Sequence, residues 1–278
     1  MAVSLKDQIG DLVSNYADVR RGEAREAFAR LREALNEGTV RAAEKVDGQW
    51  RVNEWVRKGI LLGFRVGENR DAPETGFVQA RDRDTLPLRD MKRLDARSRV
   101  VPGGSAIRDG VYIGKGVVCM PPMYINIGAY IDDETMIDSH ALVGSCAQIG
   151  KRCHISAAAQ IGGVLEPAGA WPVIIEDEVL VGAGVCVVEG VIVGQGAVLA
   201  AGLTLTSSTP VYDLVDQTIH RATAVRPLVI PPNAVVVPGS RPAKGDFARA
   251  NGLSLATPVI VKYRDRSSED SLVEDALR

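Results

Sequence analysis

Three ionisable side chains are candidates for chemistry. Arg108 lies in GSAIRDG, Asp138 in MIDSHA and Glu189 in VVEGV. An arginine can hold a carboxylate with its planar fork, and a carboxylate flanked by apolar residues can act as a general base with a raised pKa. Each residue also has a structural interpretation. Arg108 can pair with a neighbouring carboxylate, Asp138 can form a corner, and Glu189 can point into solvent.

A six-residue repeat predicts the elements that position these residues. Neither a helix of 3.6 residues per turn nor an alternating strand explains a strict apolar column with this period, whereas a hexapeptide β-helix does. Three consecutive hexads would make one triangular coil. The column comprises Val101, Ile107, Ile113, Cys119, Ile125, Ile131, Ile137, Val143, Ile149, Ile155 and Ile161.

The repeat is interrupted twice before it ends. Residues 166–172 (EPAGAWP) break it, and the column resumes at Ile175, 14 residues after Ile161. A second break at residues 210–223 precedes a last pair of hexads that start at Ile230 and Val236. We therefore predict a parallel β-helix over residues 100–240, with external loops near 166–174 and 210–223.

Most second positions of the hexads are Gly, Asn or Asp, which we attribute to corners that need unusual backbone angles. Asp138 shares this position with Asp132, so it can be a corner residue. Arg108 also occupies it, although arginine has no preference for such corners. A ligand or a neighbouring carboxylate explains Arg108 better.

The flanking segments differ from the repeat. Residues 1–99 predict a mostly helical domain, with helices at 4–20, 23–37 and 54–66 and a hairpin at 39–53. Residues 67–76 read as a loop, and the chain to Arg99 as irregular. Residues 241–278 form a carboxyl-terminal extension, with an extended run at 257–263 and a short helix at 267–277 that can cap the solenoid.

The histidines and cysteines give no pattern typical of a metal site. Ligands stacked on a solenoid lie about one coil apart, whereas His140, His154 and His220 are separated by 14 and 66 residues. We expect no metal, although His140 or His154 can serve as a base in acyl transfer. The cysteines lack a C-x-x-C pair and are interpreted as small, reduced core residues. They are Cys119, Cys146, Cys153 and Cys186.

Composition excludes several classes of function. With 33 Lys and Arg against 35 Asp and Glu, no net field favours nucleic acid or an anionic membrane. No apolar run reaches the length of a signal peptide core or a membrane span, so we expect a cytoplasmic protein. Nothing resembles a P-loop or a dinucleotide fingerprint. A ligand would lie along the outer faces, where small residues such as Gly163 and Ala201 leave backbone amides open to a long, thin molecule.

Three motifs together resemble one enzyme family. Residues 124–151 (YINIGAYIDDETMIDSHALVGSCAQIGK), 161–167 (IGGVLEP) and 187–193 (VVEGVIV) are similar to the tetrahydrodipicolinate N-succinyltransferases, succinyl-CoA-dependent enzymes of bacterial lysine and diaminopimelate biosynthesis. The likeness covers nearly the whole chain. It implies a left-handed parallel β-helix that assembles as a homotrimer with active sites between subunits, an exception to the usual right-handed crossover.

The resemblance also implies roles for individual residues. The family's substrate-binding arginine matches Arg108, its essential aspartate Asp138 and its glutamate Glu189. Asp138 and Glu189 are then the catalytic carboxylates, and Asp138 also contacts the acceptor. One departure is His140, where relatives have Trp. If the residues of the predicted loop are left out of the count, Glu189 lies two coils and seven residues beyond Asp138. Within one chain the two residues would then lie on different faces. Facing subunits of a trimer would bring them together.

Succinyl-CoA would be a co-substrate, with no tightly bound cofactor. Its pantetheine arm is expected in the groove between two β-helices, near Gly163 and Ala201, with its phosphates near basic residues of the carboxyl-terminal region. Candidates for the phosphate contacts are Arg241, Lys244 and Lys262.

Two other functions fit the repeat. One is an acetyl-CoA-dependent hexapeptide acyltransferase with His140 or His154 as base. The other is a non-catalytic β-helix that binds partners, although this leaves Arg108 and Glu189 without an explanation.

Overall fold

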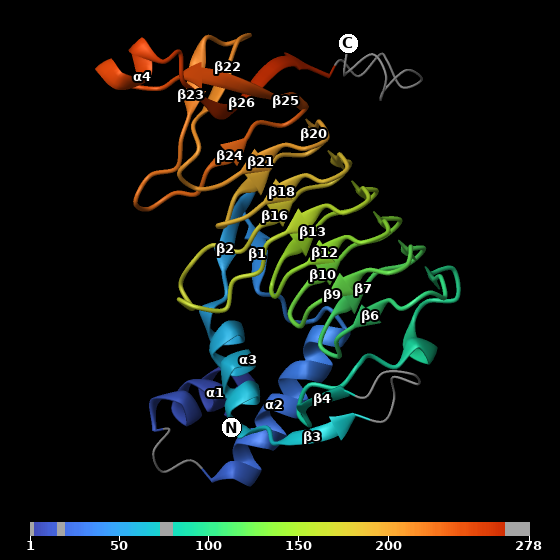
Figure 1. The fold of residues 1–278 in the computed structure, drawn as a ribbon. Helices are drawn as coiled ribbons and strands as arrows, with labels where there is room; N and C mark the ends of the chain where they lie inside the picture. Colours follow the sequence, from blue (N-terminus) through green and yellow to red (C-terminus); the bar gives the residue numbers. More distant parts are fainter. Residues whose placement is uncertain (1–2, 16–19, 73–79, 265–278) are drawn as a thin grey trace.

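A computed structural model describes residues 3–15, 20–72 and 80–264 (Figure 1). Three helices open the chain: α1 (Leu5–Ser14), α2 (Arg21–Asn36) and α3 (Glu54–Val66). Apolar residues of all three, among them Ile9, Phe28 and Ile60, are fully buried against one another. The helices predicted at 23–37 and 54–66 are confirmed, because their apolar residues recur at the helical period. The helix predicted at 4–20 is confirmed only as far as Ser14, and residues 16–19 lie outside the described residues.

A hairpin joins this helical part to the solenoid. Strands β1 (Ala43–Val46) and β2 (Gln49–Val52) pair antiparallel around Asp47 and Gly48, which both have positive φ, as a two-residue hairpin turn requires. The Trp50 indole donates to Glu176 Oε1 at 2.8 Å, and the Arg41 guanidinium lies 3.5 Å from the centre of the Tyr130 ring. The hairpin thus covers one face of the coils.

The predicted loop at 67–76 is partly wrong. Residues Asn69–Ala72 form β3, which pairs antiparallel with β4 (Ala80–Arg83), and a 3-10 helix, η3, follows at Met91–Arg93. The hairpin buries little apolar surface, so no alternating pattern announces it. Backbone pairing and ion pairs such as Arg25–Asp84, at 2.7 Å, hold this region instead.

The remaining chain is a left-handed parallel β-helix of mainly two-residue strands. Parallel partners are three hexads apart in the regular coils, as for Ile131 and Ile149, so each coil contributes one strand to each of three sheets. Sheet 1 comprises β7 (Tyr112–Ile113), β10 (Tyr130–Ile131), β13 (Gln148–Ile149), β16 (Ile174–Ile175), β19 (Ile192–Val193) and β24 (Val229–Ile230). Sheet 2 comprises β5 (Arg99–Val100), β8 (Val118–Cys119), β11 (Met136–Ile137), β14 (His154–Ile155), β17 (Leu180–Val181), β20 (Val198–Leu199) and β25 (Ala234–Pro242), extended by β26 (Ser254–Tyr263), β22 (Val211–Asp213) and β23 (Thr218–His220). Sheet 3 comprises β6 (Ala106–Ile107), β9 (Tyr124–Ile125), β12 (Leu142–Val143), β15 (Gln160–Ile161), β18 (Cys186–Val187) and β21 (Thr204–Leu205).

The predicted inward column is confirmed from Ile107 onward, where its members are buried in one continuous core. Its first member is wrong by one residue. Val100, and not Val101, pairs with Cys119, because the interval from Val100 to Ile107 is one residue longer than a hexad. The extra residue lies in the Gly103–Gly104 segment, where both glycines have positive φ.

The explanation offered for the corner glycines is also wrong. The left-handed backbone angle occurs two residues later, at positions such as Glu134, His140 and Arg152. Second-position glycines are needed for close approach between stacked coils. A Cβ on Gly144 would lie 2.1 Å from the backbone nitrogen of Gly163.

Both predicted interruptions are present. The first joins β15 to β16, and the second contains the antiparallel hairpin β22–β23. Beyond the coils, β25 pairs antiparallel with β26, which confirms the extended run at 257–263, and the short helix α4 (Asp246–Ala250) lies between these strands. The predicted helix at 267–277 lies outside the described residues. Strand β25 continues past residue 240, while the division into three domains stays a prediction.

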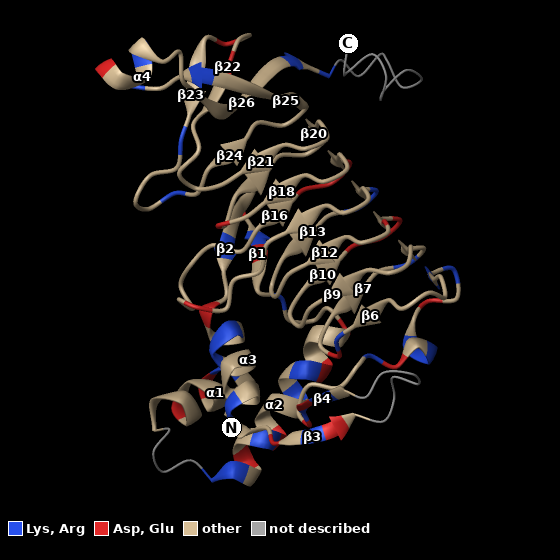
Figure 2. Ribbon diagram, in the orientation of Figure 1, with Lys and Arg blue, Asp and Glu red and all other residues tan. Residues whose placement is uncertain are grey.

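Side-chain chemistry differs between strands and corners. Figure 2 shows charged residues on the helical part and at the corners of the coils, whereas the coil strands are mostly uncharged. All four cysteines are free; Cys119, Cys146 and Cys153 are buried, but Cys186 is partly exposed on sheet 3 and is not a core residue. No helix among the described residues has the length and apolarity to cross a membrane.

Candidate active site

Arg108 lies where β6 of sheet 3 turns towards β7 of sheet 1. Its Nε donates to Tyr124 Oη at 2.9 Å, and its Nη1 lies 2.8 Å from the Leu86 carbonyl oxygen and 2.5 Å from Asp82 Oδ2. The side chain is 16% exposed and lines a hollow of about 330 Å³. The neighbouring carboxylate considered for Arg108 is therefore present. A substrate carboxylate would have to join or displace Asp82.

Asp138 lies at a different edge, where β11 of sheet 2 turns towards β12 of sheet 3. Its Oδ1 accepts from the Ser139 amide at 2.7 Å, as Asp132 Oδ1 accepts from Asp133 at 2.9 Å. The corner role is therefore real. The other oxygen, Oδ2, lies 3.6 Å from His154 Nε2, which has no hydrogen-bond partner among the described residues.

The contacts of Arg108 and Asp138 share one geometric rule. Tyr124 follows Arg108 by slightly less than one coil, and His154 follows Asp138 at the same spacing in the sequence. In each pair a second-position residue meets the outward residue of the strand one coil above. The sequence contains this spacing, but the whole-coil spacing expected of stacked metal ligands does not reveal the contact between His154 and Asp138.

Glu189 lies between β18 of sheet 3 and β19 of sheet 1, with φ of 57°. Its Oε2 accepts from the Ser207 amide at 3.0 Å and from the Ser207 hydroxyl at 2.6 Å. Despite its apolar neighbours in sequence, Glu189 is exposed, and it lines a hollow of about 600 Å³. Ser207 lies one full coil downstream of Glu189, so the coil period predicts this contact.

One chain does not bring the three residues together. Arg108 and Glu189 share the edge between sheets 3 and 1 but lie four coils apart, about 19 Å along the stack. Asp138 lies at the opposite edge of sheet 3, at a height midway between them. The expectation that Asp138 and Glu189 occupy different faces agrees with this topology.

The five residues proposed for the coenzyme are also separated. Gly163 lies at the edge of sheets 3 and 1, whereas Ala201 lies at the edge of sheets 2 and 3, and both are exposed. Arg241 and Lys262 lie near opposite ends of the β25–β26 ribbon, and Lys244 is exposed just after β25. Their roles stay predictions. Among the described residues no group of three or more His, Cys, Asp and Glu side chains could hold a metal ion.

His140 occupies a corner position with φ of 61°, and it is exposed. Its backbone amide donates to the Pro122 carbonyl at 2.5 Å. The backbone of His140 therefore helps to form the corner. A role of its side chain in catalysis stays a prediction.

Comparisons with known proteins decide the family. Residues 4–66 match the model described as "Tetrahydrodipicolinate N-succinyltransferase N-terminal", and residues 172–207 match "Hexapeptide repeat of succinyl-transferase". A 2,3,4,5-tetrahydropyridine-2,6-dicarboxylate N-succinyltransferase of Paraburkholderia phymatum is 42% identical over 95% of this chain and 94% of its own. The chain belongs to the tetrahydrodipicolinate N-succinyltransferase family. A relative of the same name from Burkholderia mallei is 46% identical over 87% of this chain and 85% of its own.

Membership of the tetrahydrodipicolinate N-succinyltransferase family confirms the resemblance seen in the sequence. Among solved structures, a putative 2,3,4,5-tetrahydropyridine-2-carboxylate N-succinyltransferase from Campylobacter jejuni matches with a TM-score of 0.43 and 14% identity, over 84% of this chain and 62% of that one. The assignment rests on the sequence relatives.

The sequence of this N-succinyltransferase family member gives no sign of the role of Arg57. Arg57 of α3 is fully buried, and its Nη1 donates to the carbonyl of Ala168 at 2.9 Å and to that of Pro167 at 3.4 Å. Burial lowers the pKa of Arg57. Arg57 thus fixes the loop that carries Glu166 and Trp171, which line the same hollow as Glu189.

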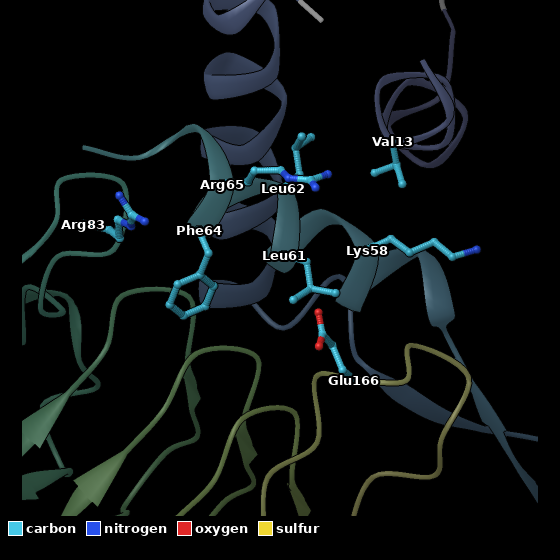
Figure 3. A pocket seen from close by; sticks show the side chains of 8 residues that line it. All are labelled: Val13, Lys58, Leu61, Leu62, Phe64, Arg65, Arg83 and Glu166. Carbon is cyan, nitrogen blue, oxygen red and sulfur yellow. The ribbon is translucent and has the colours of Figure 1, made fainter. Parts of the chain in front are cut away.

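The loop also meets α3 on its other side. A hollow of about 380 Å³ there is lined by residues of α1 and α3, by Arg83 and by Glu166, whose carboxylate points towards Leu61 (Figure 3). Glu166 therefore lies between two hollows, and the position of the loop depends on the helical part of the chain.

Proposed function

We propose that this chain transfers the succinyl group of succinyl-CoA to the amine of hydrated, ring-opened tetrahydrodipicolinate. The products would be N-succinyl-2-amino-6-oxopimelate and CoA, in lysine and diaminopimelate biosynthesis. The observation that carries the proposal is near full-length identity of 42% to an enzyme with this name. The presence of Arg108, Asp138 and Glu189 at exposed or half-buried corners supports it.

The chemistry divides among these residues. Arg108 would clamp one carboxylate of the acceptor through its guanidinium fork. Asp138 and Glu189 would supply the proton transfers that activate water for ring hydration and deprotonate the amine before it attacks the thioester carbonyl. A corner amide would stabilise the oxyanion until the CoA thiolate leaves.

A homotrimer would complete this site. Sheet 1 is covered by the β1–β2 hairpin, whereas the outward residues of sheet 3 are uncharged and partly or fully exposed. They are Ala106, Tyr124, Leu142, Gln160, Cys186 and Thr204. A cyclic arrangement with sheet 3 towards the three-fold axis would cover this uncharged face through a head-to-tail contact.

The same arrangement would assemble the catalytic residues. The edge that carries Asp138 and Ala201 would meet the neighbouring edge that carries Arg108, Gly163 and Glu189. Asp138 would then face the interval between Arg108 and Glu189. The pantetheine arm would follow the groove between the two edges, where Gly163 and Ala201 leave the backbone accessible.

The direct test is a coupled assay of CoA release with tetrahydrodipicolinate and either succinyl-CoA or acetyl-CoA. We expect acceptor-dependent release with succinyl-CoA and much slower release with acetyl-CoA. Preference for acetyl-CoA would favour the acetyltransferase interpretation. Failure to bind any acyl-CoA would favour a non-catalytic β-helix.

A further inference from the structure

The hollow that contains Glu189 is built from two external loops and two coil corners. Its lining includes Glu166 and Trp171 from the loop after β15, Glu189 and Ser207 from corners, and residues 222–227 from the segment between β23 and β24. In Figure 1 both loops project from the same side of the coil stack. The hollow, at about 600 Å³, has room for an acyl chain beside Glu189.

Arg226 alone carries a positive charge among the described residues that line this hollow. Its backbone is fixed, because its amide donates to Thr223 Oγ1 at 3.0 Å and its carbonyl accepts from the Thr223 amide at 2.9 Å. Its guanidinium is exposed and forms no hydrogen bond or ion pair with any residue that the structure describes. The fork is thus available to a ligand.

The other charges of the hollow restrict where an anion can bind. Glu166 and Glu189 are both carboxylates, and Glu189 is already held by Ser207. A ligand carboxylate would be repelled near either of them and attracted only near Arg226. One of the two acceptor carboxylates has Arg108 as its partner, in a different hollow. The other acceptor carboxylate and the carboxylate at the end of the succinyl chain remain without a partner.

We propose that Arg226 binds the terminal carboxylate of the succinyl group and thereby selects succinyl-CoA over thioesters with an uncharged acyl chain. This proposal rests on the proposed succinyl transfer. An acetyl group lacks the carboxylate but carries the same coenzyme, so only the succinyl thioester gains the guanidinium contact. A charge-assisted contact of this kind corresponds to ~10- to 100-fold in affinity.

The test compares Arg226→Gln with Arg221→Gln, a matched control at an exposed arginine that does not line the hollow. Dissociation constants for succinyl-CoA and acetyl-CoA are measured by calorimetry, after wild-type protein has been shown to transfer succinyl groups. We expect Arg226→Gln to weaken succinyl-CoA ~10-fold or more and leave acetyl-CoA unchanged. Arg221→Gln should change neither constant.

Other outcomes would overturn the proposal. Equal weakening of both thioesters would place Arg226 at the coenzyme phosphates. A change confined to the acceptor KM would place it at the acceptor, and no change at all would leave it outside the site. Absence of succinyl transfer by the wild-type protein would instead contradict the proposed function itself.

Discussion

Asp138 shows how one residue can serve both the fold and the chemistry. Its Oδ1 caps its own corner as Asp132 does, while its Oδ2 faces His154 across one coil. The six-residue repeat predicts the first contact. The second depends on the offset between a corner and the outward residue of the strand above it, which became evident only from the stacked coils.

Replacing Asp138 by Asn should separate these roles. The amide oxygen can still accept from Ser139, so the fold should persist, but the general base is lost. We expect kcat to fall ~10²-fold or more. Steady-state kinetics with succinyl-CoA provide the measurement, and Asp132→Asn is the matched control because it makes the same corner contact. Near-normal turnover of Asp138→Asn would remove Asp138 from the mechanism.

At the scale of elements, sequence patterns predict helices and strands whose apolar residues are buried at a regular spacing. They do not predict strands that are held mainly by backbone pairing. The helices and the coils place apolar residues at regular spacing, so α3 and the column from Ile107 follow from the sequence. Strands β3 and β4 bury little and have no such pattern. The loop between β15 and β16 was located by its prolines, but its attachment to Arg57 depends on tertiary packing.

Arg57→Met should impair catalysis more than folding. The variant loses the hydrogen bonds to Pro167 and Ala168, while it also removes the cost of burying a guanidinium whose Nε and Nη2 lack partners among the described residues. We expect kcat/KM to fall ~10-fold as the loop beside Glu189 shifts, with a small change in the melting temperature.

Arg51→Met on β2 is the control, because the Arg51 side chain is 63% exposed and pairs only loosely with Asp47 at 3.9 Å. Unchanged kinetics of Arg57→Met, or equal losses in the two variants, would show that Arg57 does not position the loop.

At the scale of the whole molecule, the carboxyl-terminal strands close the stack of coils. The buried Asp213 of β22 accepts a hydrogen bond from Tyr263 Oη of β26 at 2.5 Å and from the amides of Val215 and Asp216. Burial alone would raise the pKa of Asp213, but hydrogen bonds from Tyr263, Asp216 and His220 outweigh it, so the pKa lies below its usual range. Ionised Asp213 therefore fastens the hairpin to β26.

Asp213→Asn should weaken this closure in a pH-dependent way. Since the pKa is lowered in the folded state, its stabilisation is full above the unfolded value of about 3.9 and is lost as pH falls towards the folded value. We expect the variant to be about 2 kcal/mol less stable at pH 7, with the difference shrinking below about pH 4. Chemical denaturation across pH tests this, with the exposed Asp246→Asn as control. A difference that is constant with pH would contradict the assignment.

The proposed trimer can be tested through the residues that it would unite. Asp138 and Glu189 lie at opposite edges of sheet 3, so a shared site needs two subunits. Subunits carrying Asp138→Asn and subunits carrying Glu189→Gln should each be nearly inactive alone. A mixed trimer would pair the intact Asp138 of one subunit with the intact Glu189 of its neighbour.

The decisive measurement is succinyl-CoA-dependent CoA release after the two variants are co-refolded in equal amounts. Random assembly should restore about a quarter of the sites, one-half multiplied by one-half, and hence about a quarter of wild-type activity. Each variant refolded alone provides the baseline. Activity no greater than the mean of the two variants alone would contradict a succinyltransferase site built from Asp138 of one subunit and Glu189 of the next.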